Sequence, residues 1–177
     1  DYWRQLAAQA GLPGLHLVAV NYRGAQVDPA DFGMDASTWQ PLPPKSGHIP
    51  WRYPALKARM RMAKGKYKLT VLDYARIMSG LTRGSPPRFT EYPTVLPNWD
   101  NTPRSGLNGL VLHGSTPELF KTVLRRGVDL VQGYPAEQRI VFIKAWNEWA
   151  EGNYLEPDQR FGHGYLRAVR DVLQETR

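Results

Sequence analysis

The chain has no cysteine among its 177 residues. This absence excludes disulfides, thiolate nucleophiles, zinc ribbons and iron–sulfur clusters. It is compatible with the cytoplasmic location that we expect, although it does not prove one. Long apolar runs are also missing, since no stretch approaches the roughly 20 residues needed to span a bilayer. We therefore expect no transmembrane segment, and the first residues lack the charged-then-apolar order of a signal peptide.

Sets of metal ligands and phosphate loops are scarce as well. The 4 histidines are scattered, and no two of them have the spacing of metal ligands. Asp100 and Glu148 would be a poor ligand set without a third protein ligand. The glycines of "GLNGLVLHG" lack the strand-to-helix context of a phosphate-binding loop. The sequence therefore predicts no required metal and no cofactor.

What the chain does contain is typical of one globular domain, residues 1–177, because 42% of its residues are hydrophobic. The net charge is +7, and most of the excess lies in "KARMRMAKGKYK", Lys57–Lys68, which has no acidic residue. This segment either meets phosphates or anionic lipid headgroups or is a solvated, mobile connection, and we favour the second interpretation. No RNA-recognition, helix-turn-helix or zinc-finger pattern lies beside it, so we expect no sequence-specific nucleic-acid partner.

Short apolar runs alternate with amphipathic stretches along the chain. Helical spacing predicts helices over 2–10, over 70–81, from Ser115 with Glu118 as a capping box, and over 165–173. The proline-rich segment "QPLPPKSGHIP", 40–50, is expected to be a loop and is a candidate lid. Strands are expected near 15–20, 34–38, 92–98 and 139–146. Because parallel neighbours need crossover connections, this order predicts an α/β fold of parallel strands with helices on the outer face.

The unusual residues follow the ends of the expected strands, where α/β folds bind ligands. Aromatic rings beside carboxylates and amides suit a sugar, which stacks its C–H face and needs hydrogen-bond partners for its hydroxyls. The sequence therefore predicts an oligosaccharide or glycan substrate. The expected substrate-binding residues are Asn98, Trp99, Asp100, Asn101, Arg104, His113, Trp146, Asn147, Trp149 and Glu156.

Glu148 and Glu151 in "AWNEWAEGNYLEP" are the candidate catalytic pair. Glycosidic-bond chemistry needs one protonated carboxyl group and one charged carboxylate, and a tryptophan wall with a neighbouring anion would separate their protonation. We expect Glu151 to be the more easily protonated. The competing interpretation is that Glu-x-x-Glu is two solvated surface residues, and that His113 is a structural edge residue.

The chain resembles the carboxyl-terminal half of the WbsX-like family of bacterial polysaccharide and O-antigen loci, whose members are described as glycosyltransferases. The resemblance rests on "AGLPGLHLVAV", "NWDNTPR", "LHGSTPE" and "AWNEWAEGNYLEPDQRFGHGYLRAV". That family is similar to the endo-α-1,2-mannosidases of glycoside hydrolase family ninety-nine, which are (β/α)8 barrels with an Asn-Glu-Trp-x-Glu-Gly motif. The resemblance implies that Glu148 is a base acting on the sugar 2-hydroxyl and that Glu151 is the acid/base.

The same resemblance implies the carboxyl-terminal half of a (β/α)8 TIM-type barrel, since a complete barrel takes about 250 residues. Half a barrel leaves unpaired strand edges. We therefore expect either a missing amino-terminal half or a self-association partner, and an exposed apolar surface where it would pack. Two functions stay open: an enzyme that cleaves or transfers glycosyl units, and a non-catalytic carbohydrate-binding or scaffold fragment of such an enzyme.

Overall fold

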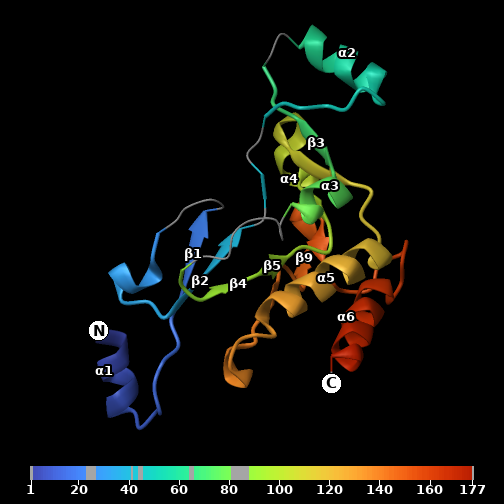
Figure 1. Cartoon of the computed structure of the whole chain (residues 1–177). Coiled ribbons are helices and arrows are strands. Elements are labelled where there is room, and N and C mark those ends of the chain that lie inside the picture. Colours follow the sequence, from blue (N-terminus) through green and yellow to red (C-terminus); the bar gives the residue numbers. More distant parts are fainter. Residues whose placement is uncertain are drawn as a thin grey trace.

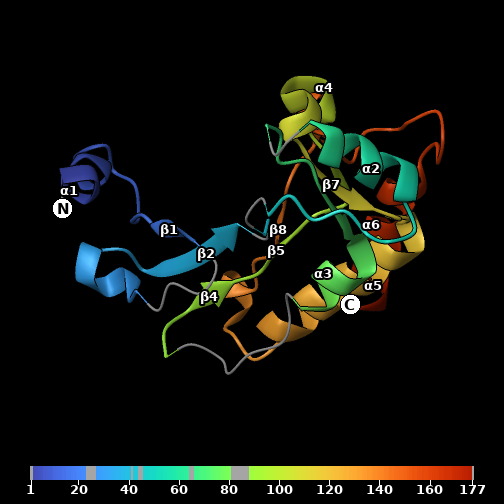
Figure 2. The same ribbon diagram turned by 90° about the horizontal axis from the view of Figure 1, so that it is seen from above.

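Figure 1 shows the computed structural model of the chain, which describes residues 2–22, 27–40, 42–43, 46–63, 66–80 and 88–176. The helices are α1 (Tyr2–Gln9), α2 (Pro54–Met62), α3 (Tyr74–Ser79), α4 (Thr102–Ser105), α5 (Pro117–Val131) and α6 (Gly164–Glu175). The strands are β1 (Val18–Tyr22), β2 (Ala36–Gln40), β3 (Thr70–Asp73), β4 (Glu91–Tyr92), β5 (Thr94–Val95), β6 (Trp99–Asp100), β7 (Leu110–His113), β8 (Phe142–Ile143), β9 (Asn147–Glu148) and β10 (Asn153–Tyr154). Both views place α1, β1 and β2 at one end of the molecule and α5 and α6 at the other (Figures 1 and 2).

The expected parallel strands are confirmed. β1 pairs with β2 and β2 with β4, while β5 pairs with β8, all in parallel. Pro93, which has no N–H, separates β4 from β5, and its carbonyl accepts a hydrogen bond of 2.9 Å from Phe142. The paired parts are shorter than expected, because β1 begins at Val18 and β8 contains only Phe142 and Ile143. The fold is mixed α/β with parallel strands, and its identification as half of a barrel stays a proposal.

A second sheet contains β3, a strand whose apolar residues have helical spacing in the sequence. The prediction of one helix over 70–81 is wrong for its first turn, because Thr70–Asp73 forms β3, parallel to β7. Thr70 and Val71 are buried. Thr70 lies opposite Leu110, so the pairing joins residues forty positions apart in the sequence. Helix α3 starts only after Asp73, whose carboxylate accepts from the backbone N–H of Arg76. Leu81 lies outside the described residues.

The start of α5 also differs from the expectation. Thr116 is the N-cap, and its hydroxyl accepts from the N–H of Leu119 at 3.3 Å. The predicted capping box of Ser115 and Glu118 is therefore wrong by one residue. The hydroxyl of Ser115 instead donates to the Pro97 carbonyl and contacts the Tyr165 hydroxyl at 2.8 Å. This contact ties the start of α5 to α6, the helix predicted over 165–173, which buries Tyr165 and Val172.

The basic segment is not a loose connection over its described first half. Lys57–Met62 belongs to α2, and Pro54 is the first residue of this helix, a position that favours proline. Leu56 and Met60 pack against a small cluster of Ile49, Leu69 and Val71. The expectation of a mobile connection fails here because these two apolar side chains, four residues apart, give the helix one anchored face. Lys64 lies outside the described residues.

The main core lies between α5, α6 and the strands β5, β6 and β7, and includes Tyr74, Trp99, Phe120 and Tyr165. Within the described ranges, apolar side chains on one face of the parallel strands are exposed. Val20 is 66% exposed and Phe142 is 37% exposed. Both line an apolar hollow of about 370 Å³, together with Val18, Thr38, Trp39, Thr94, Ile143 and Lys144. The expected exposed apolar surface is therefore present.

Candidate functional site

The two candidate catalytic glutamates lie in a tight hairpin that follows β8. β9 ends with Glu148 and pairs antiparallel with β10, so that Glu148 lies opposite Asn153. A 3-10 turn, Trp149–Glu151, joins the two strands. Gly152 closes this turn with φ of 53°, a left-handed conformation that favours glycine. The sequence "NEWAEGN" therefore fixes both carboxylates on one short hairpin.

Asn153 fastens this hairpin to the segment that follows β5. Its side-chain amide donates to the carbonyls of Asn98 and Lys144, each at 2.7 Å. In return, the side-chain oxygen of Asn98 accepts from the backbone N–H of Tyr154 at 2.9 Å. Asn153 is fully buried. These bonds bring together the two segments that the sequence predicted to meet, although sequence reasoning did not single out Asn153.

Glu151 has two cationic neighbours. Its carboxylate oxygens lie 3.1 Å from Nη1 of Arg104 and 3.8 Å from Nζ of Lys144, and its side chain is only 20% exposed. Lys144 also lies over the ring of Trp99, with Nζ 5.0 Å from the ring centroid. Arg104 and Trp99 were predicted site residues, whereas Lys144 was missed. Its position as the last residue of "RIVFIK", at the end of β8, is the signal that could have found it.

The aromatic residues of the hairpin form an exposed surface beside the glutamates. Trp149 stacks on Tyr154 with ring centroids 3.8 Å apart and 18° between the planes. The indole N–H of Trp149 donates to Glu156 at 2.6 Å. Trp146 and Trp149 are 54% and 46% exposed. Glu156 thus orients a tryptophan, and open indole faces of this kind suit the C–H face of a sugar.

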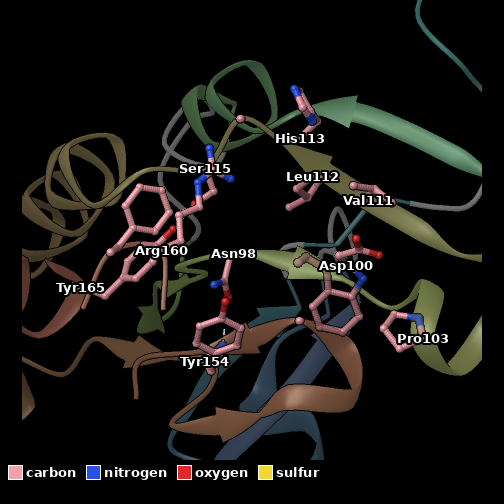
Figure 3. A pocket seen from close by; sticks show the side chains of 14 residues that line it. Asn98, Asp100, Pro103, Val111, Leu112, His113, Ser115, Tyr154, Arg160 and Tyr165 are labelled. Carbon is pink, nitrogen blue, oxygen red and sulfur yellow. Dashed lines mark hydrogen bonds between the residues drawn. The ribbon is translucent and has the colours of Figure 1, made fainter. Parts of the chain in front are cut away.

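Four predicted residues line a pocket of about 340 Å³, which Tyr154 also lines (Figure 3). These are Asn98, Trp99, Asp100 and His113. The pocket also contains residues that sequence reasoning missed, above all Ser115, Tyr154, Arg160 and Tyr165. Glu148, Glu151, Trp146 and Trp149 are not among its lining residues. The predicted residues therefore fall into two adjoining groups, a glutamate hairpin and a pocket, with Gly152 and Tyr154 between them.

Burial changes the titration of two tyrosines in this pocket. It raises the pKa of Tyr165 from the ordinary value of 10.0 to about 12. Burial also raises the pKa of the Tyr154 hydroxyl. Both groups therefore remain neutral hydroxyls at physiological pH. A neutral hydroxyl both donates and accepts, which suits the hydroxyls of a glycan.

Several predicted residues have structural contacts that occupy them. Asn101 is buried, and its side-chain oxygen accepts from the N–H of Leu110 at 2.7 Å. Asp100 accepts from the N–H and the hydroxyl of Thr102 at 2.9 and 2.6 Å. His113 is exposed and meets the ring of Tyr53 edge-on, with centroids 5.6 Å apart. Asn101 and Asp100 thus shape the turn into α4, which carries Arg104.

Two further features, a metal site and a membrane-spanning helix, are not found in the described part of the chain. Within the described ranges, His, Asp and Glu side chains form no group of three or more that would hold a metal ion. None of the helices in these ranges is long and apolar enough to cross a bilayer.

Residues 1–169 match the family model "Glycosyltransferase WbsX". The chain is 36% identical over 173 residues to the uncharacterized protein WxcX of two strains of Xanthomonas campestris pv. campestris. These residues are 97% of this chain and 24% of each relative, so the chain spans about a quarter of their length. Its fold is similar to that of a glycoside hydrolase-like protein, with a TM-score of 0.57 and 16% identity, over 97% of this chain and 48% of that protein.

Proposed function

This chain belongs to the glycosyltransferase WbsX family, and we propose that it acts on glycosidic bonds through Glu148 and Glu151. The observation that carries the proposal is the hairpin of β9 and β10, which holds both carboxylates after a parallel strand and beside exposed tryptophans. Transfer or hydrolysis of a glycan in bacterial polysaccharide or O-antigen metabolism is the corresponding biological role. A cytoplasmic location is part of the same proposal.

Glu148 and Glu151 have different surroundings, as an acid/base pair requires. Arg104 and Lys144 both form ion pairs with Glu151. The proposal includes that the bound glycan displaces one of these cations and places its leaving oxygen beside Glu151. Arg104 is the more easily displaced of the two, since its side chain is 59% exposed.

The reaction that the family resemblance implies uses both groups. Glu148 removes the proton of the sugar 2-hydroxyl, and that oxygen attacks the anomeric carbon to form an anhydro sugar. The glycosidic C–O bond breaks while Glu151 gives a proton to the leaving oxygen. A water or an acceptor hydroxyl then opens the anhydro ring. Glu151 takes the proton of the attacking hydroxyl, and Glu148 returns its proton to the sugar 2-oxygen, so both groups regain their starting state. Neighbouring sugar units would lie on Trp146 and Trp149 and in the pocket with Asn98, Asp100 and His113.

The substrate cleft of the proposal needs a second wall. The uncovered apolar face at Val20 and Phe142 is where we propose that it packs, as an amino-terminal half of the barrel or as another copy of the chain. The similarity to 48% of a glycoside hydrolase-like protein supports a half-barrel architecture of this kind.

The test is the pair of variants Glu148→Gln and Glu151→Gln, assayed with an α-1,2-linked manno-oligosaccharide in the presence of the amino-terminal half that we propose packs on the apolar face. Glutamine keeps the shape and abolishes proton transfer, so turnover should fall by about three orders of magnitude or more. The matched control is Glu137→Gln, an exposed glutamate before β8. Unchanged turnover in both site variants would overturn the proposed pair.

The alternative is a non-catalytic carbohydrate-binding domain, and the aromatic surface of Trp146 and Trp149 is the observation that favours it. Binding is measured by quenching of tryptophan fluorescence with the same oligosaccharide. If the parent and both glutamine variants bind saturably and none of them turns the oligosaccharide over, the proposal of an enzyme is replaced by that of a binding domain.

A further inference from the structure

Helix α2 presents a second face, away from the side chains that anchor it. Ala55, Ala58 and Met62 are three and four residues apart, so they share one stripe of the helix. All three are exposed, and Met62 is 82% exposed. The anchored side chains, Leu56 and Met60, lie on the opposite face. The outward stripe is therefore apolar and exposed.

Cationic side chains border this stripe on both sides. Lys57 and Arg61, four residues apart, lie along one edge, and Arg59 lies along the other. All three are exposed. No acidic residue occurs from Pro54 to Lys68, and the nearby Asp73 is paired with Arg52 at 3.5 Å. An apolar strip between rows of cations is the arrangement of helices that lie in the plane of a membrane.

Trp51 adds a further apolar group just before the helix, and it is 86% exposed. Tryptophan is enriched at the level of lipid headgroups, because its ring is apolar and its N–H is polar. Long basic side chains keep their charge in the headgroup layer while their stems cover apolar surface. A polyanion such as nucleic acid would use the cations of this segment and leave Trp51 and Met62 without a role.

We propose that α2, with Trp51 and the cations Lys57, Arg59 and Arg61, docks on the surface of an anionic lipid bilayer. The helix has only 9 residues, so the binding is weak and reversible and depends on charge. The arrowheads of β1 and β2 point toward the end of the molecule where α2 lies (Figure 1). Docking therefore brings the carboxyl ends of these strands toward the lipid surface.

The experiment is sedimentation of the full chain with vesicles of phosphatidylcholine alone or with 30% phosphatidylglycerol (roughly the anionic content of a bacterial membrane). The expected result is binding to the anionic vesicles only, which about 0.5 M salt reverses. Arg59→Gln with Arg61→Gln should weaken binding at least tenfold, since each cation near the surface contributes about fivefold. The matched control is Arg126→Gln with Arg167→Gln, two exposed arginines of α5 and α6.

Two further variants separate lipid from other polyanions. Met62→Ser and Trp51→Ser keep the charge, and each should weaken vesicle binding several-fold while leaving binding to a short duplex DNA probe unchanged. The proposal is overturned if the anionic vesicles do not bind the parent, or if the control pair loses as much binding as Arg59 and Arg61. It is also overturned if the two serine variants bind vesicles like the parent. Thermal melts check that every variant is folded, and turnover plays no part in the readout.

Discussion

The guanidinium of Arg104 donates to the carboxylate of Glu151 at 3.1 Å, across 47 residues of sequence. Arg104 comes from α4, which begins after the turn shaped by Asp100 and Asn101, whereas Glu151 comes from the hairpin after β8. The pair therefore joins the two segments at the carboxylate that we propose as the acid/base. Such a contact fixes the direction in which the carboxylate points.

Arg104→Gln is expected to lower turnover by about tenfold to a hundredfold, because Glu151 loses the partner that positions it. Stability should change by less than about 1 kcal/mol, since the ion pair is partly solvated. The measurement is turnover against pH together with a thermal melt. Arg125→Gln, which breaks the exposed pair with Glu175, is the matched control and should leave turnover unchanged. Equal turnover in both variants would show that Arg104 has no role in the reaction.

Gly152→Ala is expected to displace the hairpin. Gly152 has φ of +53°, and an added Cβ would lie 2.8 Å from the backbone oxygen of Asp100. The strained conformation and the clash should together cost about 2–4 kcal/mol. Gly133→Ala is the control, because Gly133 is exposed and its Cβ would meet open space. Chemical denaturation measures both, and a neutral Gly152→Ala would mean that the hairpin moves freely against Asp100.

Tyr165→Phe is expected to make the free energy of unfolding fall less steeply as the pH rises above about 10. Burial raises the pKa of Tyr165 to about 12, above its ordinary value of 10.0, so the unfolded chain releases this proton first. The stabilisation is complete below about pH 10 and is lost as the pH rises toward 12. Urea denaturation from pH 8 to 11.5 measures the slope. Tyr2→Phe, at an exposed tyrosine, should keep the parental slope.

At neutral pH, Tyr165→Phe should also cost about 1 kcal/mol, because the hydroxyl of Ser115 loses its contact with the tyrosine. A variant with the parental slope and stability would show that the Tyr165 hydroxyl is not buried as the structure places it.

Neutralising Lys64, Lys66 and Lys68 together is expected to leave turnover on a soluble, uncharged substrate within about twofold of the parent. These lysines belong to the basic segment of the sequence, and none of them is among the residues proposed for the site. Steady-state kinetics of the glutamine triple variant measure this. The comparison variant is Glu151→Gln, which should lose turnover under the same conditions. A large loss in the lysine variant would place the segment in the site.

The local pattern of apolar residues was sufficient to locate those strands and helices whose periodicity repeats within a few residues. Apolar runs located β1, β2, β4, β5 and β8, and the order of strands and helices gave their parallel direction. Helical spacing located α1, α5 and α6. The sequence "NEWAEG" placed Glu148 and Glu151 after the last parallel strand, because polar residues directly follow an apolar run there.

Other features depend on partners far away in the chain. Thr70–Asp73 is a strand because β7 pairs with it, and its own spacing is helical. Ser115 contacts Tyr165 instead of capping α5, because folding brings α6 to the start of α5. Asn153 and Lys144 belong to the site for the same reason. Asn153 makes a buried hydrogen bond to the Lys144 carbonyl, and the Lys144 side chain pairs with Glu151.

The sequence by itself thus determined the α/β class of the fold and the parallel direction of its strands, and it predicted the residues proposed for glycan chemistry. Only the tertiary structure decided which of those residues meet. It divided them between the hairpin of Glu148 and Glu151 and the pocket of Asn98, Asp100 and His113, and it gave Glu151 its cations. The physical reason is that periodicity records which side of an element is buried, whereas pairing across 40 or more residues is set by hydrogen bonds and charges that no local pattern contains.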